Sequence, residues 1–127
     1  MRRLALSAVL AALACGPALA ATEAPFTEAA FSAAQKQDKP ILVYVRASWC
    51  PTCAAQRPVL SKLEGDPRFQ DLQVFDVDFD AQKDVVRALG VRMQSTLIAF
   101  HGAQERARAT GVTSEDAIRA VLDKAEG

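Results

Sequence analysis

The chain has 127 residues, 15 basic and 15 acidic side chains, and a composition that is half apolar. This length and composition suit one domain with a single core, and the chain has no repeats, low-complexity runs or internal linker. The balanced charge gives no reason to expect a nucleic-acid partner.

Residues 1–20 are predicted to be a signal peptide. Two arginines follow Met1, residues 4–14 are apolar, and the segment closes on Ala-Leu-Ala, an A-x-A cleavage signal. The apolar stretch is shorter than a standard membrane-spanning helix, and no later segment approaches that length. We therefore expect a soluble mature domain over residues 21–127, with 13 basic and 15 acidic side chains.

Export would place the mature domain in an oxidising compartment, and we expect a periplasmic location. Of the three cysteines, Cys15 lies in the predicted leader, so one pair remains, Cys50 and Cys53. An alternative is a lipoprotein acylated at Cys15, although Ala12 matches that signal weakly.

Helical and strand patterns alternate along the mature chain. Thr27 is a candidate N-cap for the first helix, Pro58 falls inside the second, and Thr113 is a candidate cap for the last. The expected elements are helix 27–38, strand 41–46, helix 50–63, strand 72–78, helix 81–89, strands 96–100 and 105–110, and a helix after 113. This order predicts an α/β fold: a mostly parallel four-stranded sheet with an antiparallel C-terminal hairpin, flanked by helices.

The most informative motif is Cys50-Pro51-Thr52-Cys53, directly after the apolar strand. If a helix begins here, its free N–H groups and positive dipole end would stabilise a thiolate at Cys50. Pro51 suits the first helical position, and the two-residue spacer brings Cys53 within disulfide reach. The spacing therefore predicts a redox pair, with Cys50 attacking and Cys53 resolving.

Other interpretations of the pair are weaker. A tetrahedral zinc site needs four ligands, and beyond the leader the chain offers only Cys50, Cys53 and His101. A purely structural disulfide over so short a loop would add little stability. We expect no metal and no cofactor.

The chain resembles the thioredoxin family over about residues 26–127. The matching pieces are Ile41-Leu42-Val43, Ala47-Ser48-Trp49-Cys50-Pro51-Thr52-Cys53, Pro58, Val77-Asp78, Gly90-Val91, Thr96-Leu97-Ile98-Ala99-Phe100 and Gly111. The resemblance implies a thioredoxin fold and thiol–disulfide exchange with protein disulfides or thiols. It also implies that Trp49, Pro51, Thr52 and Thr96 shape the site.

Two positions depart from the family pattern. Where the family has a cis-proline facing the cysteines, this chain has Ser95, which restores a backbone N–H and adds a hydroxyl. Where many members have a buried Asp that handles the proton of the resolving cysteine, this chain has Tyr44. Asp76, in the neighbouring strand, is our candidate for that proton, directly or through water.

The residues between the two cysteines bear on the direction of electron flow. Strong oxidants of the family tend to carry His between the cysteines, and Pro51-Thr52 supplies no charge, which favours a reductase or a weak oxidant. A reductase in an oxidising compartment needs electrons, for which a membrane thiol transporter is the expected donor. The alternatives are a metal or iron–sulfur binding module shared between two chains, and a redox-silent interaction module.

Overall fold

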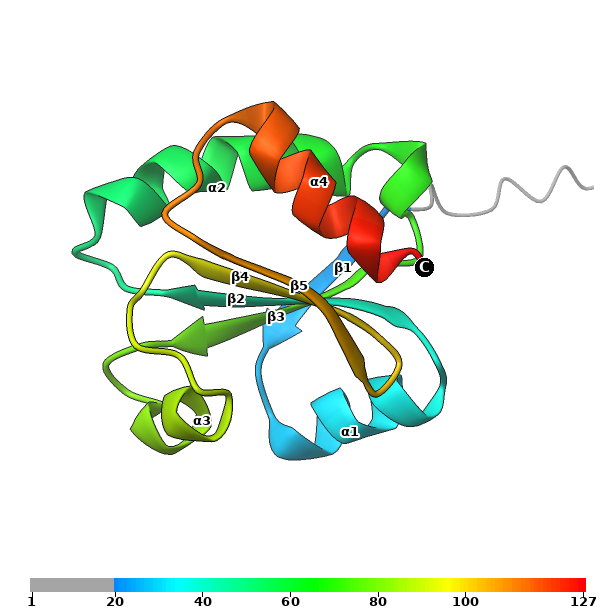
Figure 1. Ribbon diagram of the computed structural model, residues 1–127, viewed down its shortest axis with the longest axis horizontal. Coiled ribbons are helices and arrows are strands. Elements are labelled where there is room, and N and C mark those ends of the chain that lie inside the picture. Colours follow the sequence, from blue (N-terminus) through cyan, green and yellow to red (C-terminus); the bar gives the residue numbers. More distant parts are fainter. Residues whose placement is uncertain (1–19) are drawn as a thin grey trace, which may run out of the picture.

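Residues 20–127 of the computed structural model form a five-stranded sheet with helices on both faces (Figure 1). The elements are β1 Thr22–Pro25, α1 Glu28–Lys36, β2 Pro40–Arg46, α2 Pro51–Glu64, a 3₁₀ turn Pro67–Phe69, β3 Gln73–Asp78, α3 Lys83–Ala88, β4 Thr96–His101, β5 Gln104–Thr110 and α4 Glu115–Ala125. None of the helices described over this range is long and apolar enough to cross a membrane. The predicted signal peptide, with Cys15, lies outside the described residues except for Ala20.

The strand order is β1-β3-β2-β4-β5, so the expectation of four strands is wrong by one. The additional strand is β1, which pairs in parallel with β3. Its sequence, Thr-Glu-Ala-Pro, has no apolar alternation, and none of its four residues is buried. An edge strand held by backbone hydrogen bonds does not need a hydrophobic pattern, so periodicity could not reveal it.

The α/β thioredoxin fold is confirmed, but the parallel part of the sheet is smaller than expected. Strands β1, β3 and β2 run in parallel, whereas β4 is antiparallel to β2 and β5 is antiparallel to β4. The reason lies in α3, which has six residues and a length of about 9 Å, against about 20 Å for β3. This helix cannot return the chain along the whole strand, so β4 starts at the end where β3 finishes.

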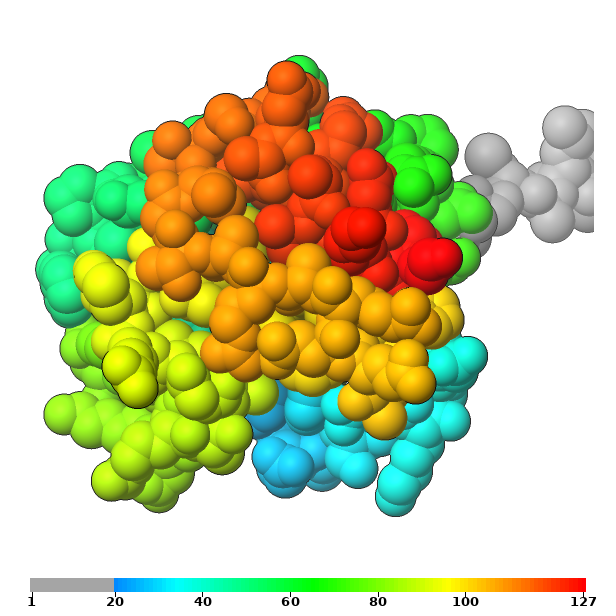
Figure 2. Space-filling view, in the orientation of Figure 1, coloured from blue at the N-terminus to red at the C-terminus, as the bar shows by residue number. Residues whose placement is uncertain are grey.

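Two hydrophobic cores lie on the two faces of the sheet. Helices α2 and α4 cover one face, and α1 and α3 cover the other (Figure 1). Strand β2 serves both, because Leu42 and Tyr44 point to the first core while Val43 and Val45 point to the second. The prediction of a central strand buried on both faces is therefore confirmed. Figure 2 shows that β5, by contrast, forms part of the molecular surface between α4 and α1.

Helix caps set where the helices begin. The Thr27 hydroxyl accepts a hydrogen bond from the backbone N–H of Ala30 at 3.2 Å, which confirms the predicted cap of α1. For α4 the prediction of Thr113 is wrong by one residue. The Ser114 hydroxyl caps this helix, at 3.2 Å from the N–H of Ala117.

Candidate functional site

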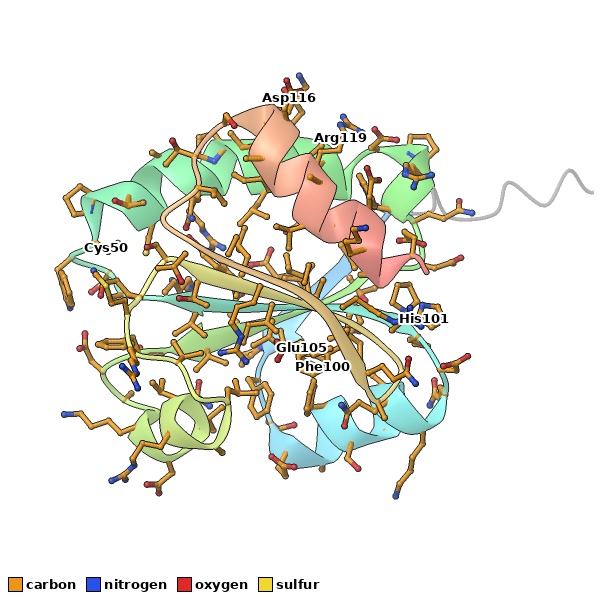
Figure 3. The ribbon with its side chains drawn as sticks, in the orientation of Figure 1. Cys50, Phe100, His101, Glu105, Asp116 and Arg119 are labelled. Atoms are coloured by element: carbon orange, nitrogen blue, oxygen red, sulfur yellow. The ribbon has the colours of Figure 1, made fainter. Side chains whose placement is uncertain are left out.

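The two cysteines lie where the chain leaves β2 and enters α2. Cys50 is the N-cap of α2, and its Sγ atom accepts a hydrogen bond from the backbone N–H of Cys53 at 3.1 Å. Pro51 occupies the start of the helix, where no intrahelical N–H donor is needed. Figure 3 shows Cys50 at the opposite end of the sheet from His101. His101, the third candidate zinc ligand, is therefore remote from the thiols.

The environment of Cys50 favours its thiolate. Burial opposes ionisation, but hydrogen bonds from the Cys53 thiol and from the backbone N–H groups of Cys53 and Thr52 offset it. The Gln94 side chain adds another hydrogen bond. The pKa of Cys50 is consequently lowered from its ordinary value, as expected for a thiol at a helix N-terminus.

The environment of Cys53 has the opposite effect. Burial and the hydrogen bond to Cys50 raise the pKa of the Cys53 thiol. Both cysteines are free and each is only 3% exposed. Exposure therefore does not distinguish the two thiols. The two thiols differ in their hydrogen bonding, since Cys50 receives the N–H groups of the first helical turn.

Trp49 is the large exposed side chain beside the thiols, at 57% exposure. Its indole N–H donates a hydrogen bond of 2.6 Å to Asp80, which follows β3. Asp80 did not stand out in the sequence, because its role depends on the ends of β2 and β3 being adjacent. This contact holds the indole ring at the surface next to Cys50.

The loop before β4 brings Ser95 and Thr96 to the same end of the sheet. The structure contains no cis peptide bond within residues 20–127, and Ser95 has a φ of +59°. The Ser95 hydroxyl donates to the carbonyl of Gln94 at 2.5 Å, so it is engaged within its own loop. The Thr96 hydroxyl contacts the carbonyl of Met93 at 2.8 Å and the Thr110 hydroxyl at 2.9 Å.

Gln56, a fully buried residue of α2, joins this loop to the helix that carries the cysteines. Its side-chain nitrogen donates to the carbonyl of Ser95 at 3.2 Å and to that of Val112 at 2.8 Å. The backbone N–H of Gly111 also donates to Ser95, at 3.0 Å. The loop opposite the thiols is thus held from two directions.

Tyr44 and Asp76 are adjacent in the sheet, because they are register partners between β2 and β3. The Tyr44 hydroxyl donates a hydrogen bond of 3.2 Å to the carbonyl of Cys53, and the side chain is fully buried. Burial raises the pKa of Tyr44 far above its ordinary value. Tyr44 therefore stays neutral and supports Cys53 through its backbone.

Asp76 belongs to a charged cluster beneath α2. Its Oδ1 atom lies 3.5 Å from Nε of Arg46 and 3.7 Å from an Arg57 nitrogen. Arg57 also pairs with Glu23 of β1 at 3.0 Å. Both arginines therefore pair with Asp76, and neither of them is among the main groups that set the pKa of Cys50.

The carboxyl groups of this cluster share protons. Burial, followed by the hydrogen bond to Glu23, raises the pKa of Asp76 to about 7. Burial and the charge of Glu23 likewise raise the pKa of Glu64 to about 7. The hydrogen bond from Asp76 lowers the pKa of Glu23 instead. Near neutral pH the cluster can both accept and donate a proton.

A cavity of 130 Å³ lies beside the thiols and reaches the two arginines of this cluster. Its lining consists of Arg46, Ala47, Ser48, Cys50, Cys53, Ala54 and Arg57. The same two arginines contact Asp76.

The structure thus gathers the sequence-derived candidates at one end of the sheet, with Asp76 set back beneath α2. Sequence reasoning missed Glu23, Gln56, Glu64, Asp80 and Gln94. For Gln94 a signal existed, because it directly precedes Ser95. No such signal existed for Glu23, which enters the cluster through the unexpected strand β1.

Comparison with known proteins gives one consistent result. The family model described as Thioredoxin matches residues 22–124. A thioredoxin of Pseudomonas aeruginosa is 33% identical over 88 residues, which cover 69% of this chain and 81% of that protein. Thioredoxin Asp f 29 of Aspergillus fumigatus is 31% identical over 71 residues, 56% of this chain, and the match spans 64% of that protein's length.

Among solved structures, the crystal structure of Trxlp from Edwardsiella tarda superimposes with a TM-score of 0.78. That protein is 42% identical in sequence, and the match covers 80% of this chain and 98% of the other.

Proposed function

Because this chain belongs to the thioredoxin family of thiol–disulfide oxidoreductases, we propose that Cys50 and Cys53 are its redox pair and that it reduces disulfides in exported proteins. The observation that carries this proposal is the hydrogen bond from the Cys53 N–H to the Cys50 sulfur at the start of α2. It supports a stabilised thiolate at Cys50 facing a protonated partner at Cys53.

The reaction proceeds by two exchanges. The Cys50 thiolate attacks one sulfur of the substrate disulfide, which forms a mixed disulfide and expels the other sulfur as a thiolate. Cys53 then loses its proton and attacks the Cys50 sulfur, which closes the Cys50–Cys53 disulfide and expels the second substrate thiolate. Two electrons pass from the cysteine pair to the substrate.

A reducing direction is supported by the residues between the cysteines. Pro51 and Thr52 add no positive charge that would stabilise the thiolate as strongly as in a potent oxidant. Trp49 and the loop that carries Ser95 and Thr96 flank the thiols and would form the docking surface for an extended substrate segment.

The predicted signal peptide supports the proposed location, and that location in turn calls for an electron donor. Residues 1–20 would direct export to the periplasm, and the oxidised pair would regain electrons from a membrane thiol transporter. Acylation at Cys15 is the alternative fate. Cell fractionation of the full chain, compared with a Cys15→Ala variant, distinguishes the two, because only an acylated form would partition with membranes in a Cys15-dependent way.

Two measurements test the proposed activity. The protein should accelerate reduction of insulin disulfides by dithiothreitol, and Cys50→Ser should remove that acceleration. Equilibration with glutathione should give a reduction potential of about −270 mV, the thioredoxin value, rather than about −120 mV, which marks a strong oxidant. An absence of reductase activity in a folded protein would contradict the proposal.

A further inference from the structure

We propose that Asp76, with Glu23 as its carboxyl partner, takes up the proton that Cys53 releases when it resolves the mixed disulfide, through water in the cavity between the cysteines and Arg57. This inference rests on the proposed function, and it assigns the proton step of that reaction to residues on β1 and β3. The buried position that usually serves this step in the family holds Tyr44, which has no carboxylate.

The need for a proton acceptor follows from the state of Cys53. Its thiol is buried and protonated, while the nucleophile of the second exchange must be a thiolate. Tyr44 cannot accept this proton, because its hydroxyl already donates to the carbonyl of Cys53 and its oxygen remains protonated. The acceptor must therefore lie outside the immediate contacts of the thiol.

The cavity provides a route for the proton that Cys53 releases. It touches Cys53 on one side and Arg46 and Arg57 on the other, and its 130 Å³ has room for about four water molecules. Guanidinium N–H groups order water by hydrogen bonding and do not titrate in this pH range. The two arginines then place the route beside Oδ1 of Asp76, at 3.5 and 3.7 Å.

Asp76 is poised to receive a proton. Its Oδ1 atom is buried and accepts no hydrogen bond, so it remains available to a proton. The groups that face it are Glu23 from β1, Arg46 from β2, and Arg57 and Glu64 from α2. The arginines keep the cluster from becoming fully protonated, and the neighbouring carboxylates make an added proton favourable.

Cys53–SH transfers its proton through the cavity water to the Asp76–Glu23 pair, and the resulting thiolate forms the S–S bond with Cys50. The S–S bond between Cys50 and the substrate breaks, and the substrate sulfur leaves with the bonding electron pair. The carboxyl pair later releases its proton to solvent near Glu23, whose side chain is about one-third exposed.

The test separates the two exchanges in a stopped-flow reaction of the reduced protein with Ellman's reagent, an aromatic disulfide that releases a coloured thiolate at each exchange. The first release depends on reagent concentration and reports attack by Cys50. The second is first-order and reports attack by Cys53. Both are recorded between about pH 5 and pH 9, which brackets the ionisation of the cluster.

We expect Asp76→Asn to slow the second release at least about tenfold at neutral pH and to remove its pH dependence near 7, with the first release unchanged. Asp76→Glu should restore the second release, because it retains a carboxylate. Glu23→Gln should shift the pH profile of the same phase. Asp71→Asn, which removes a surface carboxylate just before β3, is the matched control and should leave both phases unchanged.

Three results would overturn the assignment. The first is a second release that is unaffected in Asp76→Asn and in Glu23→Gln. The second is an equal slowing of both phases in Asp76→Asn, as expected from a general structural change. The third is a failure of Asp76→Glu to restore the rate of the second release. Failure of the proposed function looks different, because the wild-type protein would then give no second release at all.

Discussion

The carbonyl oxygen of Ser95 lies 3.2 Å from the side-chain nitrogen of Gln56. This contact ties the loop that faces the thiols to the helix that begins at Cys50. It also holds Ser95 in the left-handed backbone region, at a φ of +59°. The loop is thus maintained by its neighbours in a conformation that serine does not prefer.

Substitutions at Ser95 should reveal this backbone constraint. A left-handed conformation costs most residues about 1–2 kcal/mol, and glycine avoids that cost. We therefore expect Ser95→Gly to be about 1 kcal/mol more stable than Ser95→Ala, with the hydroxyl absent from both. Ser95→Pro should lose more than about 1 kcal/mol, because proline fixes φ near −65°. Urea unfolding measures the series, and equal midpoints for Gly and Ala would contradict it.

Gln94 should tune the reactivity of Cys50. Replacing it by leucine removes a hydrogen bond to the thiolate, so the pKa of Cys50 should rise. Alkylation rates measured against pH give this value directly. Met93→Leu is the control, because Met93 is exposed in the same loop and is not among the groups that set the pKa of Cys50. An equal rise in both variants would indicate a general effect on the loop.

Because Cys50 attacks and Cys53 resolves in the proposed mechanism, the two serine variants should behave differently. Cys53→Ser should still attack a substrate disulfide but should accumulate the mixed disulfide, because no second thiol resolves it. Cys50→Ser should form little of that adduct. Mass spectrometry after brief exposure to glutathione disulfide distinguishes them, and normal turnover by Cys53→Ser would exclude a two-thiol mechanism.

The elements with strong local patterns were predictable from the sequence. The apolar run of β2, the cap at Thr27 and the placement of the cysteines at a helix start depend on neighbours in sequence, and each was found in the structure. The motif and its spacing also identified the family. Such local features can be predicted without knowing which segments of the chain are in contact in the fold.

The remaining features depend on long-range contacts. Strand β1 has a polar sequence and becomes a strand only by pairing with β3, more than forty residues later in the chain. The charged cluster joins Glu23, Asp76 and Glu64 from three elements, so no local pattern indicates it. The direction of β4 likewise depends on the shortness of α3.

Trp49 offers a further test, because it is the single tryptophan of the chain. Asp80→Ala removes the acceptor of its indole N–H, so the ring should move more freely and its fluorescence anisotropy should fall. Stability should change by no more than about 1 kcal/mol, since the bond is exposed. Asp84→Ala, a surface change in α3, should leave the anisotropy unchanged. A similar fall in both variants would refute the role of Asp80.

The carboxyl cluster also predicts how stability varies with pH. Asp76 and Glu64 have folded-state pKa values of about 7, above their ordinary values of 3.8 and 4.5. Folding therefore favours their protonated forms, and the cost of ionising them disappears as the pH falls from about 7 towards 4. The lowered pKa of Glu23 has the opposite sign, and its contribution is lost only below about pH 4.5.

The free energy of unfolding should thus rise by on the order of 1–2 kcal/mol between about pH 8 and pH 5, and fall at lower pH. Asp76→Asn should flatten this rise, and Asp71→Asn should not. Urea unfolding at several pH values measures both. A wild-type stability that decreases steadily from pH 8 to pH 5 would contradict the shared-proton cluster.

Under the proposed proton step, strand β1 would make the beginning of the folded domain part of its redox chemistry. It holds Glu23 against Asp76, while the cysteines lie at the start of α2. A nascent chain could close the turn around Cys50 before its N-terminal segment docks, but its carboxyl pair would be incomplete. Proteolytic trimming beyond Pro25 would have the same effect, leaving both thiols in place and changing the pH at which they work.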